Sequence, residues 1–298
     1  MSVIQMTNSE GLQNKSSGNG CNNLCQQNVQ PIHHSKIIDI MTSEVATITP
    51  ESTLHEAANL MGQKRIGSLV VMKYDTPVGI LTERNLLNVV NDGVKLVKDW
   101  IGGGRSIREE KVEKAMTFPL VRACFRSSIK DTARIMIENR VNRLMVCESG
   151  KLAGIVTTSD MIRSLPRIRK TMKEWFEVDY FMSKHVITAD EHTLLEEAVA
   201  LMAKERVGSV IVTSKEKPVG IFTERDLLTR FLAKDKSLIE EVGNAASYPL
   251  NTAHIGISVH DAAVIMNEKR IKRLPITKDN ELVGVLSARD LIEAYARG

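Results

Sequence analysis

The chain has 298 residues, room for about two ordinary domains. Hydrophobic residues make up 43% of it and charged residues 26%, which is normal for a globular protein with a substantial core. A net charge of +4 is too mild to indicate a nucleic-acid or membrane partner, and an aromatic content of 4% disfavours single-strand binding by base stacking. Because the sequence shows no secretory signal and no apolar run near the length of a membrane span, we expect a cytoplasmic protein.

Residues 1–35 are rich in Asn, Gln, Ser and Gly and show no apolar periodicity. Such a segment cannot bury enough apolar surface to offset its ordering entropy, so we predict that it is disordered. Cys21, Cys25, His33 and His34 lie within it, but their spacing matches no common zinc pattern. No metal is therefore predicted as a cofactor.

The first structured unit is predicted over residues 36–93. Thr53 and Glu56 form a capping box before a helix whose apolar side chains recur every three or four residues. Two apolar runs joined by a polar turn then predict a hairpin, and a second helix closes the unit. The order is strand, helix, strand, strand, helix, and the elements are predicted at 45–48, from 53, at 68–72, at 78–81 and at 83–90.

One line of sequence occurs four times, at 79–85, 154–160, 220–226 and 284–290. Each copy has a glycine, two apolar residues, a hydroxyl and, three positions later, an aspartate or (in the first copy) an asparagine. This pattern predicts a strand that runs into the first turn of a helix, and four copies of one unit indicate a repeat protein. We predict further units at 113–166, 180–234 and 235–298, a linker at 94–112 and a linker helix at 167–179.

The repeats alternate in type, so the unit of organisation is a pair of repeats that occurs twice. The first member of each pair carries Gly-Ser before its middle strand, and the second carries a pair that ends in arginine. These residues are Gly67, Ser68, Gly208 and Ser209 in the first members, and Asn142, Arg143, Lys272 and Arg273 in the second. The predicted caps of the first helices in repeats two to four are Ser128 with Asp131, Thr193 with Glu196, and Ser258 with Asp261.

The repeated line predicts a site for a nucleotide. It sets a hydroxyl at a helix N-terminus, where free N–H groups and the helix dipole favour an anion such as phosphate. The carboxylate one turn later can accept hydrogen bonds from both hydroxyls of a ribose. The alternative is a helix cap that needs no ligand. The leading glycine and the alternation of glycine with arginine favour a ligand, since glycine lets the backbone approach a flat ring and arginine grips phosphate.

The four units, over residues 36 to 295, resemble CBS domains. The resemblance implies an α/β fold of four β-α-β-β-α units in two Bateman modules that form a flat, pseudo-symmetric disc. Two units of such a module dock through their sheets, and the module often binds adenosine-containing ligands in its clefts. The plan of four units is similar to the gamma subunit of AMP-activated protein kinase.

The resemblance also implies roles for residues by position. The ribose-binding aspartate of the family is matched by Asp160, Asp226 and Asp290. The phosphate-side hydroxyl is matched by Thr157, Thr223 and Ser287, and in the first repeat by Thr82. A phosphate-contacting His-Arg pair is matched, without its histidine, by Asn142-Arg143 and Lys272-Arg273. Adenine-side positions are matched by Thr42, Ala46, Gly67 and Ser68 for the site of Asp160, and by Ser183, Ile187, Gly208 and Ser209 for the site of Asp290.

The first repeat departs from the family pattern, because Asn85 stands where the aspartate is expected. An amide oxygen can still accept a hydrogen bond but carries no charge. We therefore predict that this site is weak or empty.

The sequence predicts a non-catalytic regulatory protein that binds AMP, ADP or ATP in up to three clefts and signals to a partner protein. A homodimer is left open. One alternative keeps the clefts but places S-adenosylmethionine or a cyclic dinucleotide in them. The other is an adaptor that binds nucleic acid or protein through a basic cluster, although a solvated linker surface is the simpler account of that cluster. The cluster is Arg163, Arg167, Arg169, Lys170 and Lys173.

Overall fold

The computed structural model describes residues 36–94, 109–165 and 177–297. The predicted disordered segment 1–35, most of both predicted linkers and four members of the basic cluster lie outside the described residues. Those four are Arg167, Arg169, Lys170 and Lys173.

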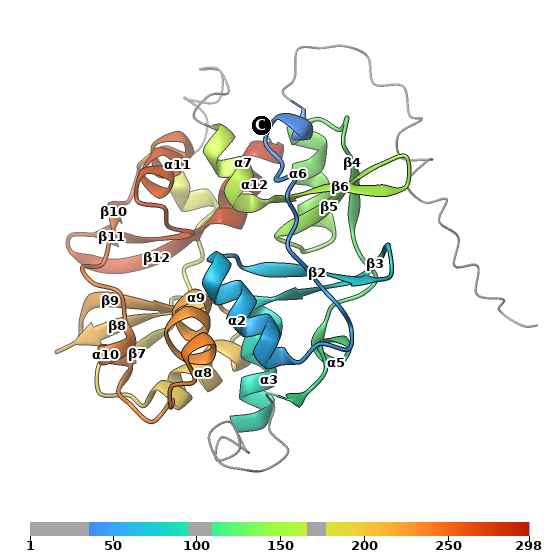
Figure 1. Ribbon diagram of the computed structural model, residues 1–298. Coiled ribbons are helices and arrows are strands. Elements are labelled where there is room, and N and C mark those ends of the chain that lie inside the picture. The colour runs from blue at the N-terminus through green and yellow to red at the C-terminus, as the bar shows by residue number, and fades with distance from the viewer. Residues whose placement is uncertain (1–35, 95–108, 166–176, 298) are drawn as a thin grey trace, which may run out of the picture.

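Each repeat has the predicted order of elements (Figure 1). Repeat one contains β1 (Thr47–Ile48), α2 (Leu54–Lys64), β2 (Ser68–Lys73), β3 (Thr76–Thr82) and α3 (Glu83–Val94). Repeat two contains β4 (Arg122–Cys124), α6 (Ile129–Glu138), β5 (Arg143–Glu148), β6 (Lys151–Thr157) and α7 (Thr158–Ser164). Repeat four contains β10 (Ala253–His254), α11 (Val259–Glu268), β11 (Arg273–Lys278), β12 (Glu281–Ser287) and α12 (Ala288–Arg297).

Repeat three differs in its closing helix. It contains β7 (Thr188–Asp190), α8 (Leu195–Lys204), β8 (Ser209–Ser214) and β9 (Lys217–Thr223). The chain then winds through α9 (Glu224–Asp226), a π-helical turn η6 (Leu227–Phe231) and a 3₁₀ turn η7 (Leu232–Lys234). A π-helical turn is a local widening that often accompanies a functional site.

Every repeat builds one three-stranded sheet of the same design. The first strand pairs in parallel with the second, so the helix between them is the crossover that parallel pairing requires. The second and third strands form an antiparallel hairpin, as the polar turn between the apolar runs predicts. The first residue of each middle strand pairs with the hydroxyl residue that ends the hairpin, and these pairs are Ser68 with Thr82, Arg143 with Thr157, Ser209 with Thr223, and Arg273 with Ser287.

The predicted caps of the first helices are confirmed in three repeats. The hydroxyls of Thr53, Ser128 and Ser258 each accept a hydrogen bond from the backbone three residues on. The prediction for repeat three is wrong, because α8 begins after Leu194 and Glu197 accepts from the Leu194 N–H at 3.3 Å. With the helix starting one residue later than predicted, the apolar face of α8 lies in the core. Burial of this face outweighs the better capping side chain of Thr193.

A short lead-in precedes each repeat and crosses to the other member of its pair. These segments are η1 (Ile37–Asp39), α5 (Val112–Ala115), η5 (Val178–Tyr180) and α10 (Val242–Ala245). Ile37 precedes repeat one but is fully buried in the core of repeats two and four. Val112 precedes repeat two but is fully buried in the core of repeats one and three. A residue that precedes one repeat along the chain can therefore belong to the core of the other member of its pair.

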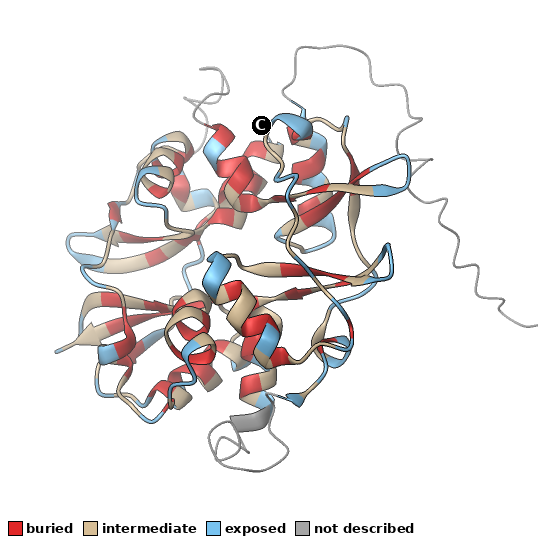
Figure 2. Cartoon of the chain, viewed as in Figure 1, coloured by how far each residue is buried: buried red, intermediate tan, exposed pale blue. Residues whose placement is uncertain are grey.

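Two apolar cores join the repeats through their helices (Figure 2). One contains Leu54 of repeat one together with Phe222 of repeat three, and α2 lies against η6 and η7. The other contains Met161 of repeat two together with Leu291 of repeat four, and α6 and α7 lie against α12. Helices thus connect repeat one to three and repeat two to four.

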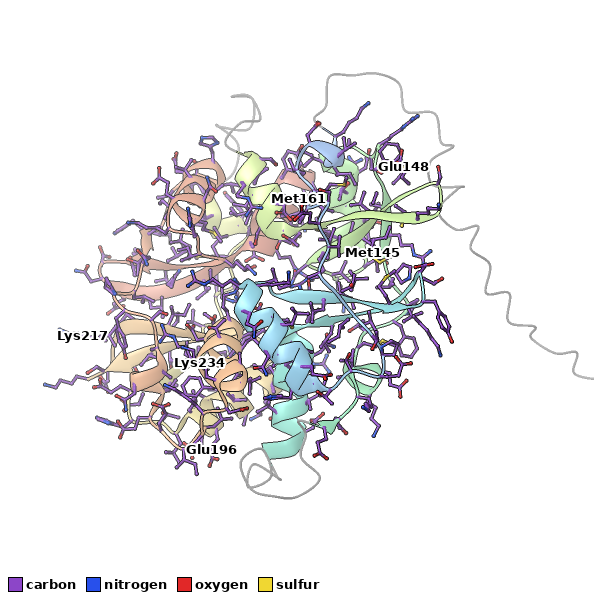
Figure 3. The ribbon with its side chains drawn as sticks, viewed as in Figure 1. Met145, Glu148, Met161, Glu196, Lys217 and Lys234 are labelled. Atoms are coloured by element: carbon purple, nitrogen blue, oxygen red, sulfur yellow. The ribbon has the colours of Figure 1, made fainter. Side chains whose placement is uncertain are left out.

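In the first pair, the sheets of the two members are in contact. Met145 on β5 lies buried against Val70 on β2, between the sheets of repeats one and two (Figure 3). Lead-ins also bridge repeat one to two and repeat three to four. The four repeats consequently surround a common centre, which is the pseudo-symmetric arrangement predicted from the resemblance (Figure 1). None of the helices in the described ranges is both long and apolar enough to span a bilayer.

Candidate ligand sites and the charged centre

The hydroxyl and the carboxylate of the repeated line contact each other in repeat two. Oδ2 of Asp160 accepts hydrogen bonds from the N–H and the hydroxyl of Thr157, at 2.8 and 2.7 Å. Asp160 is only 5% exposed, and its other oxygen is paired with Arg163. The hydrogen-bonded helix cap, which the sequence offers as the alternative explanation of this motif, is therefore present in repeat two. Arg163, the one described member of the basic cluster, points back to its own repeat.

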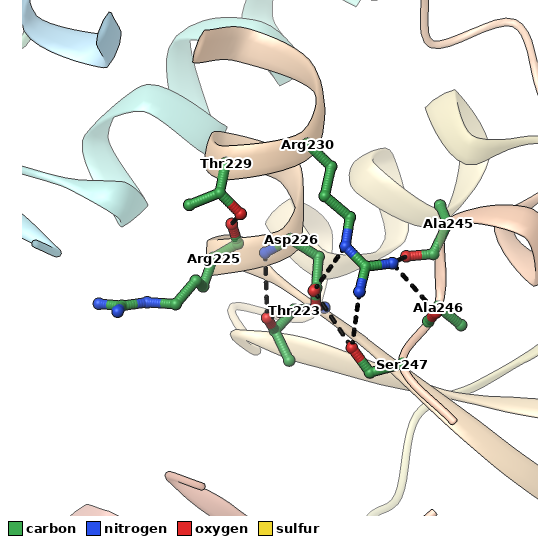
Figure 4. A network of polar contacts seen from close by, with 8 residues as sticks. All are labelled: Thr223, Arg225, Asp226, Thr229, Arg230, Ala245, Ala246 and Ser247. Carbon is green, nitrogen blue, oxygen red and sulfur yellow. Dashed lines mark hydrogen bonds and ion pairs between the residues drawn. The ribbon is translucent and has the colours of Figure 1, made fainter. Parts of the chain in front are cut away.

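Asp226 of repeat three lies in a larger network (Figure 4). Oδ2 accepts from the N–H and the hydroxyl of Thr223, at 3.0 and 2.6 Å. Oδ1 accepts from the hydroxyl of Ser247 at 3.3 Å and lies 3.4 Å from Nε of Arg230. Arg230 also donates to the carbonyl oxygens of Ala245 and Ala246, at 2.9 and 3.2 Å. One arginine thus ties this carboxylate to the lead-in of repeat four.

Asp290 of repeat four is the least engaged of the three carboxylates. Oδ2 accepts from the Ser287 N–H at 2.6 Å. Among the described residues, Ser287 supplies the hydrogen bonds to this carboxylate, and no arginine or lysine forms an ion pair with it. Burial raises the pKa of Asp290 above its usual 3.8, although the bond from Ser287 opposes the shift. A ligand at this site therefore does not have to displace a described arginine or lysine from the carboxylate.

In repeat one, the side-chain amide of Asn85 forms hydrogen bonds with other residues of the protein at both its oxygen and its nitrogen. Its Oδ1 accepts from the N–H and the hydroxyl of Thr82, at 2.9 and 2.6 Å. Its amide nitrogen donates to the hydroxyl of Thr117 at 3.0 Å. Both ends of the amide are thus used, and the helix cap forms without an aspartate.

The leading glycine of each line has a structural role that the sequence did not reveal. A Cβ on Gly154 would lie 2.7 Å from the carbonyl oxygen of Thr42, and one on Gly284 would lie 3.0 Å from that of Ser183. Thr42 exchanges two backbone hydrogen bonds of 2.9 Å with Ile155, so the lead-in crosses directly over the strand. These glycines make room for the crossing chain. Their presence is therefore weaker support for a flat ligand ring than the sequence suggested.

The alternation of glycine with arginine also has a direct structural reason. Arg143 donates from Nη1 to the carbonyl oxygen of Gly67 at 2.5 Å. A Cβ on Gly208 would lie 1.9 Å from Nη2 of Arg273, so any side chain at this position would require the guanidinium group to move. Gly208 thus makes room for Arg273, whereas a Cβ on Gly67 would meet Glu83 at 2.9 Å and Arg225 at 3.2 Å.

Two further groups of predicted residues lie around Asp160 and Asp290, in repeats two and four. In repeat two, Arg143 lies opposite Thr157, and Thr42 crosses beside them; in repeat four, Arg273 lies opposite Ser287, and Ser183 crosses beside them. Asp160 and Asp290 complete these groups through their bonds to the hydroxyl residues. The adenine-side positions Ala46 and Ile187 pack against the core of repeats one and three.

Charged residues from all four repeats meet at the centre of the molecule. Glu83 of repeat one pairs with Nε of Arg225 of repeat three at 3.0 Å, and Glu224 of repeat three pairs with Arg84 of repeat one. Arg289 of repeat four donates from Nη2 to Oδ1 of Asn142 of repeat two at 3.0 Å.

Burial depresses the basicity of this centre. It lowers the pKa of Lys272 from 10.5 to about 8, and it lowers the pKa of the Arg143 and Arg273 guanidinium groups. The carboxylates of Glu83 and Glu224 oppose each of the two arginine shifts, so both acids lie close to both arginines. The centre is thus a buried array of cations that contains the two glutamates, with Asp160 also acting on Arg143 and Asp290 on Arg273.

Several residues of these sites were missed by the sequence reasoning, among them Arg230 and Arg289. Six others carried a signal in the sequence. Thr117 and Ser247 occupy the crossing positions in the sites of Asn85 and Asp226, and their alignment with Thr42 and Ser183 would have found them. The other four are Glu83, Arg84, Glu224 and Arg225, and the shared Thr-Glu-Arg of repeats one and three was their signal. Within the described residues, no group of three or more His, Cys, Asp or Glu side chains is placed to hold a metal ion.

Comparison with known proteins gives one matching family model, described as the CBS domain, at residues 37–92, 112–167, 177–233 and 239–297. An uncharacterized 33.4 kDa protein of the ribosomal RNA operon of Thermofilum pendens is 30% identical over 203 residues, which are 65% of this chain and 63% of that protein. The uncharacterized protein MJ1404 of Methanocaldococcus jannaschii is 26% identical over 277 residues, 87% of this chain and 61% of that protein. The chain thus spans less than two thirds of either relative.

One solved structure extends this comparison to the whole arrangement. The crystal structure of MJ1225 from Methanocaldococcus jannaschii, a proposed archaeal homologue of g-AMPK, superposes with a TM-score of 0.74. The match covers 88% of this chain and 100% of that one, at 17% identity. At that identity the likeness concerns the fold alone.

Proposed function

Because the chain belongs to the CBS-domain family, we propose that it is a non-catalytic regulatory protein that binds adenosine-containing ligands between its paired repeats. The observation that carries this proposal is the group around Asp290. Arg273 lies opposite Ser287 across the hairpin, Ser287 opens α12, and Asp290 forms no ion pair with a described residue, unlike Asp160 and Asp226.

Each part of this group suits one part of such a ligand. The first turn of α12 and the Ser287 hydroxyl offer donors to a phosphate or to another anionic group. The carboxylate of Asp290 suits the two hydroxyls of a ribose, and a charge-assisted bond of that kind contributes roughly 1.5–3 kcal/mol. Arg273 supplies a cation next to the phosphate position.

The sites differ in whether the carboxylate is already paired with an arginine. Asp160 and Asp226 already pair with Arg163 and Arg230, so a ribose at either site must compete with an arginine. Asn85 lacks the charge altogether. We therefore propose up to three ligands, with the site of Asp290 the first to fill.

The proposed ligands are AMP, ADP or ATP. Binding would change the relative orientation of the two pairs of repeats, and a partner protein would respond to that change. S-adenosylmethionine and cyclic dinucleotides share the same ribose and anion chemistry, so they belong in the test. Isothermal titration calorimetry with these compounds, together with thermal unfolding, decides the matter. Absence of both heat and a thermal shift at millimolar ligand would refute the proposal.

A further inference from the structure

Glu83 and Glu224 occupy equivalent places in repeats one and three, directly after the hydroxyl of the repeated line. Glu83 is only 7% exposed, and the side chain of Glu224 is 13% exposed. Each pairs with the arginine that follows the other glutamate, which gives two reciprocal ion pairs across the centre. Buried carboxylates of this kind need a positive environment, and the centre supplies one.

The two carboxylates also lie beside the arginines proposed to clamp phosphate. A Cβ on Gly208 would lie 1.9 Å from Nη2 of Arg273 and 3.1 Å from Oε2 of Glu224, so these two groups share one small space. At the equivalent place in the other pair, a Cβ on Gly67 would lie 2.9 Å from Oε2 of Glu83. Arg143 donates to the carbonyl oxygen of that same glycine.

The balance of charge at the centre is therefore limited. Six cations face four carboxylates there, a formal excess of two positive charges. The cations are Arg84, Arg143, Arg225, Lys272, Arg273 and Arg289, and the carboxylates are Glu83, Glu224, Asp160 and Asp290. One monophosphate carries about two negative charges and fits within this excess. A free triphosphate carries about four and would place its outer phosphates against the internal carboxylates, where repulsion in a buried setting is strong.

We propose that Glu83 and Glu224 are specificity-determining residues: as built-in counter-ions of the central arginines, they make the sites favour adenosine ligands with at most one phosphate over ADP and ATP. The inference rests on the proposed function, since it concerns the charge of the ligand in those sites. The glutamates act by occupying the positions that additional phosphates would otherwise take beside Arg143 and Arg273. They need not touch a monophosphate ligand.

The test is calorimetry of the wild-type chain with adenosine, AMP, ADP and ATP, without Mg²⁺, followed by E83Q, E224Q and the double variant. We expect the wild type to bind AMP roughly tenfold or more tightly than ATP, since each tenfold step is a modest electrostatic difference at these distances. In the double variant we expect that preference to fall by about tenfold or more. Glu268→Gln, at the exposed end of α11, makes the same charge change away from the centre and should keep the wild-type preference.

The possible outcomes separate the two proposals. If no adenosine compound binds, the proposed function fails. If AMP binds but the wild type binds ATP as tightly as AMP, the role of the glutamates is overturned, whatever the variants do. If the preference for AMP exists but is the same in E83Q, E224Q and Glu268→Gln, it has another origin and the inference is equally overturned. Thermal unfolding of each variant shows whether it is folded, and the wild-type series needs no variant.

Discussion

Replacing Gly62 with alanine tests the helix contact that joins repeat one to repeat three. Gly62 lies in α2, and a Cβ there would be 2.5 Å from Cβ of Ala233 in η7. An ordinary contact between two such carbons needs about 3.4–4 Å, so α2 and η7 must separate by roughly 1 Å. Overpacking of this kind costs about 1–3 kcal/mol, and the higher helix propensity of alanine returns up to about 1 kcal/mol.

We therefore expect Gly62→Ala to destabilise the protein by about 1–2 kcal/mol, or a fall in Tm of about 2–8 °C for a chain of this size. Without the contact, the same change would stabilise the helix, so the sign of the effect is diagnostic. Ala233→Gly removes the opposing methyl group, and the double variant should recover most of the loss. Urea unfolding of all four chains gives the coupling energy. A stabilised Gly62→Ala, or a double variant with no recovery, would refute the proposed packing.

Three further predictions concern the sites. Asn85→Asp restores the missing charge and should add one equivalent of ligand in calorimetry; unchanged stoichiometry and affinity would count against a weak first site. Asp290→Asn should keep the cap, as Asn85 does in repeat one, but weaken binding at that site about tenfold to a hundredfold, and an unaltered affinity would contradict the ribose role. Lys272, whose pKa is about 8 against 10.5 when free, binds fewer protons folded than unfolded between those values, so its contribution to stability should rise by roughly 3 kcal/mol from pH 8 to pH 10.5. Urea midpoints at pH 7.5 and 10 should show that rise in the wild type and a smaller one in Lys272→Met; equal pH dependence in the two proteins would show that Lys272 is not buried as described.

The helix caps show how far local sequence reasoning reaches. Thr53, Ser128 and Ser258 were predicted correctly because a cap depends on residues three positions apart. The cap at Thr193 was predicted wrongly by one residue. There the best local capping residue and the apolar face of the helix disagree, and burial of the face wins because it involves more free energy than one hydrogen bond.

The motif glycines show where local reasoning fails. From the sequence alone these glycines indicate room for a ligand, whereas Gly154 makes room for the chain at Thr42, more than a hundred residues earlier. Gly208 likewise makes room for Arg273. A glycine indicates that another group approaches the backbone closely, but only the folded structure shows which group this is.

The sequence by itself determined the number of repeats, the order of elements within each repeat and the position of each hydroxyl relative to its carboxylate. All of these depend on residues a few positions apart, and four copies of the pattern reinforce one another. Only the tertiary structure decided that helices join repeat one to three and two to four, that lead-ins cross within a pair, and that Glu83 and Glu224 meet the arginines of other repeats. Such contacts depend on which surfaces fit when distant segments pack, and no short-range pattern in the chain specifies that fit.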